Sequence, residues 1–181
     1  MSQPILDALL EVQRQGEALL LTLSDEVYAQ PIPEGLGASI GAHYRHHLEH
    51  VHAWLNPDDR GIIDYDARPR DRRLETDRAA ALERTREQMA ACLRVDPEHL
   101  RRATAVRCRV SYDLEEESAL TPSSVGREAM NVIVHGVHHY ALISVLCRIK
   151  GIALPEGFGV APSTARHRHE LAQSTSATSA G

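Results

Sequence analysis

Apolar residues near the start of the chain recur at helical spacing. Between residues 4 and 29 they include Ile5, Leu9, Val12, Leu19, Leu20 and Leu23. Apart from the adjacent pair Leu19 and Leu20, successive members are three, four or seven positions apart, which is the repeat of an amphipathic helix. Helix-breaking residues follow directly, at Pro31, Pro33, Gly35 and Gly37. The pattern predicts a first helix over residues 4–29.

A second helix is predicted from residue 40 to about Leu55. Ser39 is a suitable N-cap because its hydroxyl can accept a hydrogen bond from a free backbone N–H of the first turn. The pair Asn56-Pro57 prevents continuation, since proline disfavours helical backbone in the residue before it. The apolar stripe of this helix consists of Ile40, Tyr44, Val51, Trp54 and Leu55.

The middle of the chain is less regular. Residues 57–74 are too polar and too broken by proline for a buried element, which predicts a long surface crossover. The helical pattern resumes over Glu75–Leu93 with alanine-rich neighbours, and this is the third predicted helix. Residues 103–113 alternate apolar and polar side chains, so a short β-hairpin insertion is expected around 103–120.

The fourth predicted helix is the most apolar part of the chain. Ser123 or Ser124 can cap it, and Gly151 is a typical residue to end it. Its side chains are apolar nearly all round, so it should be the most buried helix. After Pro155 an extended wrap is expected, and the Ser/Thr/Ala/Gly composition from about residue 173 predicts disorder.

These elements together predict an all-α fold with one domain. Residues 1–165 would form a four-helix bundle, and residues 166–181 a C-terminal tail. The two long connections argue against simple up-down-up-down order.

Composition narrows the class of protein. The net charge of −5 and the pI near 6.1 offer no general attraction to nucleic acid or to anionic membranes. The three cysteines are odd in number and far apart, which argues against a disulfide framework. The first residues lack the features of a secretory signal, and no run approaches the roughly 20 apolar residues of a membrane span. A cytoplasmic protein is expected.

Histidine is the unusual component. Of eleven histidines, eight lie in residues 43–52 and 135–139. His135 and His139 are four apart on the apolar helix, so their rings lie one turn apart on one face and can bind one ion. An unpaired polar ring in so apolar a helix would cost a few kcal/mol. A metal is therefore expected, although hydrogen bonds among the histidines or exposure to solvent would also satisfy the rings.

The second helix must supply further ligands. The spacing alone leaves the choice open; the candidates are His43, His46, His47, His50 and His52. Relative to the apolar stripe, His47 lies near the centre of the inward face and His43 at its edge, while His46 lies further round.

Two segments, SIGAHYRHHLEHVHAWL and MNVIVHGVHHYALISVL, resemble the DinB-like superfamily of metal-binding four-helix bundles. The resemblance covers most of residues 1–155. In that superfamily a histidine seven residues after a Ser/Thr cap joins an HxxxH pair. The resemblance thus implies His46, His135 and His139 as ligands of one zinc or nickel ion. This chain departs from the family pattern at Leu142, three residues after His139, where glutamine or histidine is usual.

The resemblance also implies an up-down-down-up bundle, a homodimer, and kinship with transferases that join low-molecular-weight thiols to electrophiles. The expected function is a metal-dependent thiol transferase, or a hydrolase that activates water, with a small-molecule substrate. The alternative is a non-catalytic metal-binding protein, or a dimeric scaffold or stress-related protein. A fourth protein ligand, such as His43 or His50, would favour that alternative.

Other polar residues are weaker candidates. Glu128 and Asn131 lie on roughly the same helical stripe as His135 and could support a ligand, although caps or interface contacts are the simpler explanation. The arginines of the crossover could meet an anionic substrate, but a solvated loop is the favoured explanation; they are Arg68, Arg70, Arg72 and Arg73.

Overall fold

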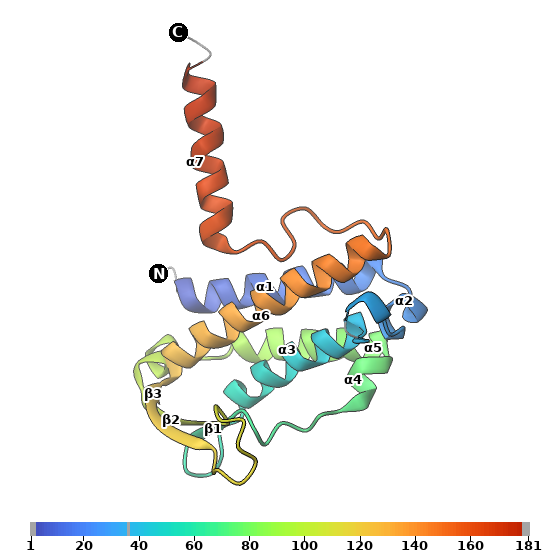
Figure 1. Cartoon of the computed structure of the whole chain (residues 1–181). Helices are drawn as coiled ribbons and strands as arrows, with labels where there is room; N and C mark the ends of the chain where they lie inside the picture. Colours follow the sequence, from blue (N-terminus) through green and yellow to red (C-terminus); the bar gives the residue numbers. More distant parts are fainter. Residues whose placement is uncertain (1–2, 36, 179–181) are drawn as a thin grey trace.

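The computed structural model describes residues 3–35 and 37–178, which form helices and one small sheet (Figure 1). The α-helices are α1 (Pro4–Thr22), α2 (Asp25–Ala29), α3 (Ile40–Leu55), α4 (Arg72–Thr76), α5 (Arg78–Cys92), α6 (Val125–Ile149) and α7 (Pro162–Thr178). The strands are β1 (Ile62–Asp64), β2 (Ala103–Cys108) and β3 (Ala119–Ser124), and 3-10 turns lie at Pro33–Gly35 and Pro97–Arg101.

The four long helices α1, α3, α5 and α6 form the body. Helices α1 and α3 each pack against both α5 and α6. In Figure 1, α1 and α6 run in one direction and α3 and α5 in the other. The largest fully buried apolar side chains come from these helices and their connections, and they include Leu9, Leu19, Leu20, Tyr44, Leu48, Tyr140 and Ile143.

Local capping signals set the helix ends. The hydroxyl of Ser39 accepts a hydrogen bond from the backbone N–H of Ala42 (2.9 Å), and Ser124 caps α6 in the same way. Gly151 ends α6 with a φ of +66°, a conformation that glycine adopts without strain. The first predicted helix differs, because it is split into α1 and α2. Ser24 caps α2, so its side chain competes with continuation of α1.

The prediction of an all-α four-helix bundle is wrong, because the chain contains a mixed three-stranded sheet. Its order is β1-β2-β3, with β1 parallel to β2 and β2 antiparallel to β3. Strand β2 begins at the predicted position, but β3 continues past residue 120, the predicted end of the hairpin, as far as the cap of α6. The sheet is therefore an integral part of the fold beside α3 and α6.

Strand β1 was missed because its signal is too short to show a period. It lies inside residues 57–74, which the sequence predicted as a surface crossover. Ile62, Ile63 and Tyr65 are buried, since β2 and α3 cover them. Burial here depends on partners remote in sequence, and a polar composition averaged over the segment hides it.

Helix α6, with 25 residues, is the longest of the described helices. Among the described helices it is the one long and apolar enough to cross a membrane, which the sequence analysis had not anticipated. In this globular fold it packs against α1 and α3, with 44% of its most apolar stretch buried. Its other face leaves apolar side chains exposed, among them Met130, Val134 and Val145.

Helix α7 extends away from the body (Figure 1). The sequence analysis expected an extended segment followed by disorder from about residue 173, whereas the helix runs to Thr178. Pro162 occupies its first position, where a missing N–H has no cost. The last predicted tail residues, 179–181, lie outside the described part of the chain.

Candidate metal centre

Helices α3 and α6 bring four histidines together at their interface. The helices lie side by side in opposite directions, and each presents two rings one turn apart. We call His46, His50, His135 and His139 the histidine cluster. Ring centroids are 4.9 Å apart for His46 and His135, 4.6 Å for His46 and His139, and 3.9 Å for His50 and His135.

A glycine permits this close approach of the two helices. A Cβ atom at Gly136 would lie 2.6 Å from Cε1 of His47, closer than real contacts allow. His47 is fully buried, and its Nε2 lies 2.7 Å from Oε1 of Gln13. The inward position predicted for His47 is confirmed, but the ring packs in the core beside the cluster.

Three members of the cluster have the spacing of a metal site. His46, His50 and His135 can each present one nitrogen within 4.8 Å of the other two. His139 adjoins them, but its Nδ1 lies 3.2 Å from Nδ1 of His43. The structure therefore brings together the predicted His46 and His135, adds His50, and places His139 beside His43.

The hydrogen bonds of His135 and His50 leave a nitrogen lone pair available on each ring. Nε2 of His135 is buried and has no hydrogen-bond partner among the described residues. Nδ1 of His50 lies 2.9 Å from the carbonyl oxygen of His46, to which it can only donate, so Nε2 of His50 keeps its lone pair. An N–H bound to a backbone carbonyl commonly orients metal-binding histidines. These residues fit a divalent ion.

Burial keeps these imidazoles neutral. It lowers the pKa of His135 and of His139 to about 3, with the neighbouring histidines acting in the same direction. It lowers the pKa of His46 to about 2, with His50 and Arg68 as further causes. Neutral rings are the form that binds a metal, so no proton has to leave at neutral pH.

The metal-free protein should lose stability in mild acid. His47 is fully buried and its pKa is lowered from 6.5 to about 3, so between these values the unfolded chain binds more protons than the folded one. The contribution of neutral His47 to the free energy of unfolding is complete above pH 6.5 and is lost as the pH falls toward 3. One such group gives a slope of about 1.4 kcal/mol per pH unit. Urea titrations with a chelator, at about pH 7.5 and about pH 5.5, measure it; equal free energies of unfolding would contradict the expectation.

The loop between β1 and α4 covers the cluster. Its Arg68 donates from Nη1 to Nδ1 of His46 (2.5 Å) and from Nε to the carbonyl oxygen of Tyr65. Glu49 of α3, with 2% of its side chain exposed, holds the same loop by accepting the backbone N–H of Asp71 (2.8 Å). The sequence analysis missed Glu49, and it favoured a solvated position for Arg68.

Tyr65 supports the cluster from the same loop. Its ring stacks on His50 with centroids 5.2 Å apart, and its hydroxyl donates to Glu128 (3.1 Å). Glu128 also accepts a hydrogen bond from Ser123 (2.6 Å), and Asn131 acts on the Tyr65 hydroxyl by lowering its pKa. Glu128 and Asn131, the two predicted auxiliary residues, thus contact Tyr65, which in turn contacts His50 of the cluster. Their position four and seven residues before His135 was the available signal, but nothing in the sequence indicated Tyr65.

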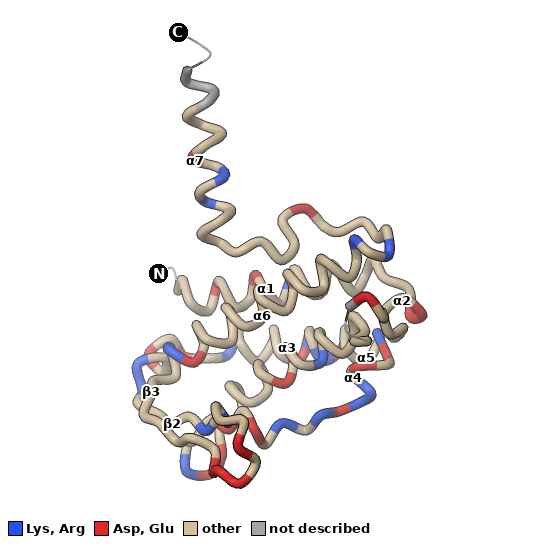
Figure 2. Tube along the Cα trace, in the orientation of Figure 1, with Lys and Arg blue, Asp and Glu red and all other residues tan. Residues whose placement is uncertain are grey.

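The other crossover arginines differ from Arg68. Figure 2 shows basic positions along the segment that leads into α4. Arg70, Arg72 and Arg73 are exposed, as expected of a solvated loop. Arg68, with 15% of its side chain exposed, is the one of the four that reaches the histidines.

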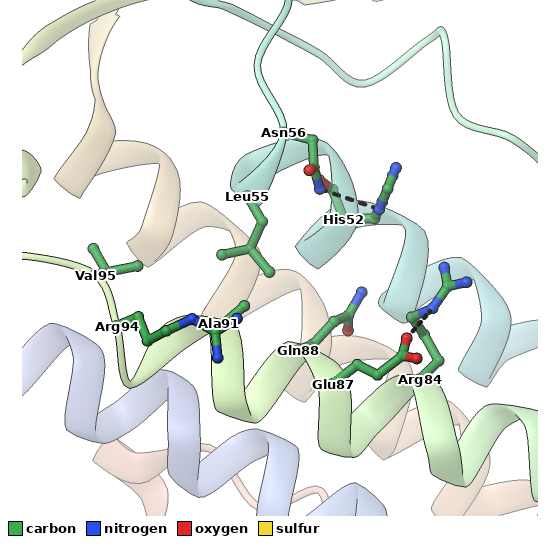
Figure 3. Close-up of a pocket in the computed structure, with 9 residues that line it drawn as sticks. All are labelled: His52, Leu55, Asn56, Arg84, Glu87, Gln88, Ala91, Arg94 and Val95. Atoms are coloured by element: carbon green, nitrogen blue, oxygen red, sulfur yellow. Dashed lines mark hydrogen bonds and ion pairs between the residues drawn. The ribbon is translucent and has the colours of Figure 1, made fainter.

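A separate cavity of about 430 Å³ lies between α3 and α5 (Figure 3). Its lining includes His52, which lies 3.2 Å from the amide nitrogen of Asn56, and the ion pair of Arg84 with Glu87 (3.0 Å). His52 is two residues after His50 and hence about 200° further round the helix. This cavity and the histidine cluster are different places in the fold.

Comparison with known proteins adds one partial match. No family model matches the chain, and no solved structure matches it. The chain is similar to FK506-binding protein 5 of Rhizopus delemar, with 33% identity over 112 residues. The match covers 59% of this chain and 27% of that protein, so the chain spans about a quarter of the length of this curated relative.

Proposed function

We propose that the chain is a DinB-like protein that binds one divalent metal ion, zinc or nickel, between α3 and α6. The observation that carries the proposal is the buried, unpartnered Nε2 of His135 facing the rings of His46 and His50. A buried ring nitrogen without a hydrogen-bond partner lowers the stability of the fold, and a bound metal ion would be a partner for it. The sequence resemblance favours the same two helices.

The spacing favours His46, His50 and His135 as ligands, whereas the resemblance favours His139 as the third. In either set the ligands are neutral, so a bound ion would keep its full double charge and deprotonate a coordinated thiol or water. On the core side, the buried ring of His47, paired with Gln13, separates the histidine cluster from solvent. On the other side, the ring of Tyr65 stacks on His50 and orients it. These features support a thiol transferase, or a hydrolase, that acts on a small molecule.

A non-catalytic metal protein is the second candidate. One observation favours it: both His50 and His139 lie at the cluster, so four protein ligands could close the coordination shell. A structural zinc site is usually closed in this way, whereas a catalytic site keeps one position for substrate.

We also propose a cytoplasmic homodimer that binds neither nucleic acid nor membrane. The net charge of −5 supports the exclusion of nucleic acid. The exposed apolar side chains on α6 support an interface between two copies, because contiguous apolar surface tends to be covered.

Cobalt substitution tests the proposed chemistry. We expect cobalt-loaded protein to change its visible absorption when glutathione or another low-molecular-weight thiol is added, because a thiolate enters the open position. Metal-dependent conjugation of the thiol to a chlorodinitrobenzene should follow, above the rate of metal-free protein. A cobalt site whose spectrum no thiol or water-replacing anion alters would instead support the closed, non-catalytic site.

A further inference from the structure

Arg68 stands out among the polar groups at the histidine cluster because it is a cation beside a site for a cation. Its guanidinium donates to Nδ1 of His46, and its Nε is anchored on the carbonyl oxygen of Tyr65 within the same loop. The side chain is 15% exposed. The arginine is thus held at the rim of the cluster, between the rings and solvent.

The hydrogen bond from Arg68 cannot coexist with ligation by His46. If His46 accepts that bond at Nδ1, its proton is on Nε2, and neither nitrogen is free for a metal. If His46 binds a metal through Nε2, then Nδ1 carries the proton and two donors face each other. If it binds through Nδ1, the ion takes the place of the guanidinium. In both modes of metal binding, Nη1 of Arg68 loses its acceptor.

Apart from His46, no acceptor among the described residues lies within hydrogen-bond distance of Nη1 of Arg68. The closest carboxylate, that of Glu49, lies 3.9 Å from Nη1 of Arg68. Its two oxygens already bind Arg45 (2.9 Å) and the backbone N–H of Asp71 (2.8 Å). A half-buried guanidinium nitrogen that loses its acceptor is costly, and the planar fork of an arginine matches a carboxylate with two parallel hydrogen bonds.

We propose that Arg68 recognises a carboxylate on the small molecule that occupies the open metal position. This inference rests on the proposed metal site and narrows its substrate to an anionic class, such as a thiol that carries a carboxylate. The carboxylate accepts from Nη1, the donor that metal binding frees, and from Nη2, which makes no hydrogen bond among the described residues, while the hydrogen bond from Nε to Tyr65 keeps the guanidinium at the rim. Arg68 is therefore a residue that determines specificity, distinct from the ligands.

Paired thiols test the proposal on cobalt-loaded protein. Mercaptoacetate and 2-mercaptoethanol offer the same sulfur with and without a carboxylate, and each is titrated by visible absorption. We expect the wild type to bind mercaptoacetate at least tenfold more tightly, and the Arg68→Gln variant to bind both alike while keeping its cobalt. Arg72→Gln is the matched control, because it removes the same charge from an exposed position near the same loop.

The outcomes separate the inference from the function on which it rests. Equal binding of the two thiols by the wild type, or a preference that survives in Arg68→Gln, overturns the role of Arg68 and leaves the metal site intact. An equal loss in Arg72→Gln also overturns it, since a general effect of charge would then suffice. If the wild type binds no cobalt, or if neither thiol alters its spectrum, the proposed thiol chemistry fails and the inference fails with it.

Discussion

The His135→Ala variant should bind zinc or nickel at least about a hundredfold more weakly than the wild type, because even residues that only orient a ligand are worth 10–100-fold. His135 belongs to both candidate ligand sets, and its buried Nε2 has no other partner among the described residues. Competition against a chelator of known affinity, with elemental analysis of the purified protein, measures the change. Stoichiometric metal retained by this variant would rule out the site.

A control and a comparison sharpen this test. His138 lies on the same helix but is exposed, so His138→Ala should keep wild-type affinity. His50→Ala and His139→Ala then decide the third ligand. A larger loss in His50→Ala supports the set that the spacing favours, a larger loss in His139→Ala supports the set that the resemblance implies, and equal large losses support a closed site with four ligands.

Replacing Glu49 by alanine should destabilise the metal-free protein by about 3–5 kcal/mol, the usual cost of removing one member of a buried ion pair. Glu49 is 2% exposed, pairs with Arg45 and holds the β1–α4 loop through Asp71. Its loss leaves the partly buried Arg45 with Glu75 as its remaining partner at 3.1 Å and releases the loop from α3. Urea denaturation in the presence of a chelator measures the effect.

Glu87→Ala is the matched control for that variant. Its carboxylate pairs with Arg84 at 3.0 Å, but 61% of its side chain is exposed. Exposed ion pairs contribute about 0–1 kcal/mol, so this substitution should have little effect. Similar losses of unfolding free energy in the two variants would show that the effect of Glu49 on stability does not come from its burial.

The sequence predicted well what depends on neighbouring residues. Ser39 and the pair Asn56-Pro57 mark the ends of α3 because capping and proline act within one turn of the backbone. Ser124 and Gly151 mark the ends of α6 for the same reason. The four-residue spacing of His135 and His139 likewise fixed that both rings share one face, whatever the helix packs against.

Contacts between remote segments decided the rest. Strand β1 is buried only because β2 pairs with it and α3 covers it, so three residues in a polar stretch carried no local signal and the all-α prediction was wrong. The place of Arg68 against His46, and of His50 against His135, depends on how closely α6 approaches α3 and on where Glu49 holds the loop. The sequence by itself determined which residues could form helices and which histidines share one face of a helix. Tertiary packing decided which of them meet, because a helical repeat gives the face of each side chain but not what lies opposite.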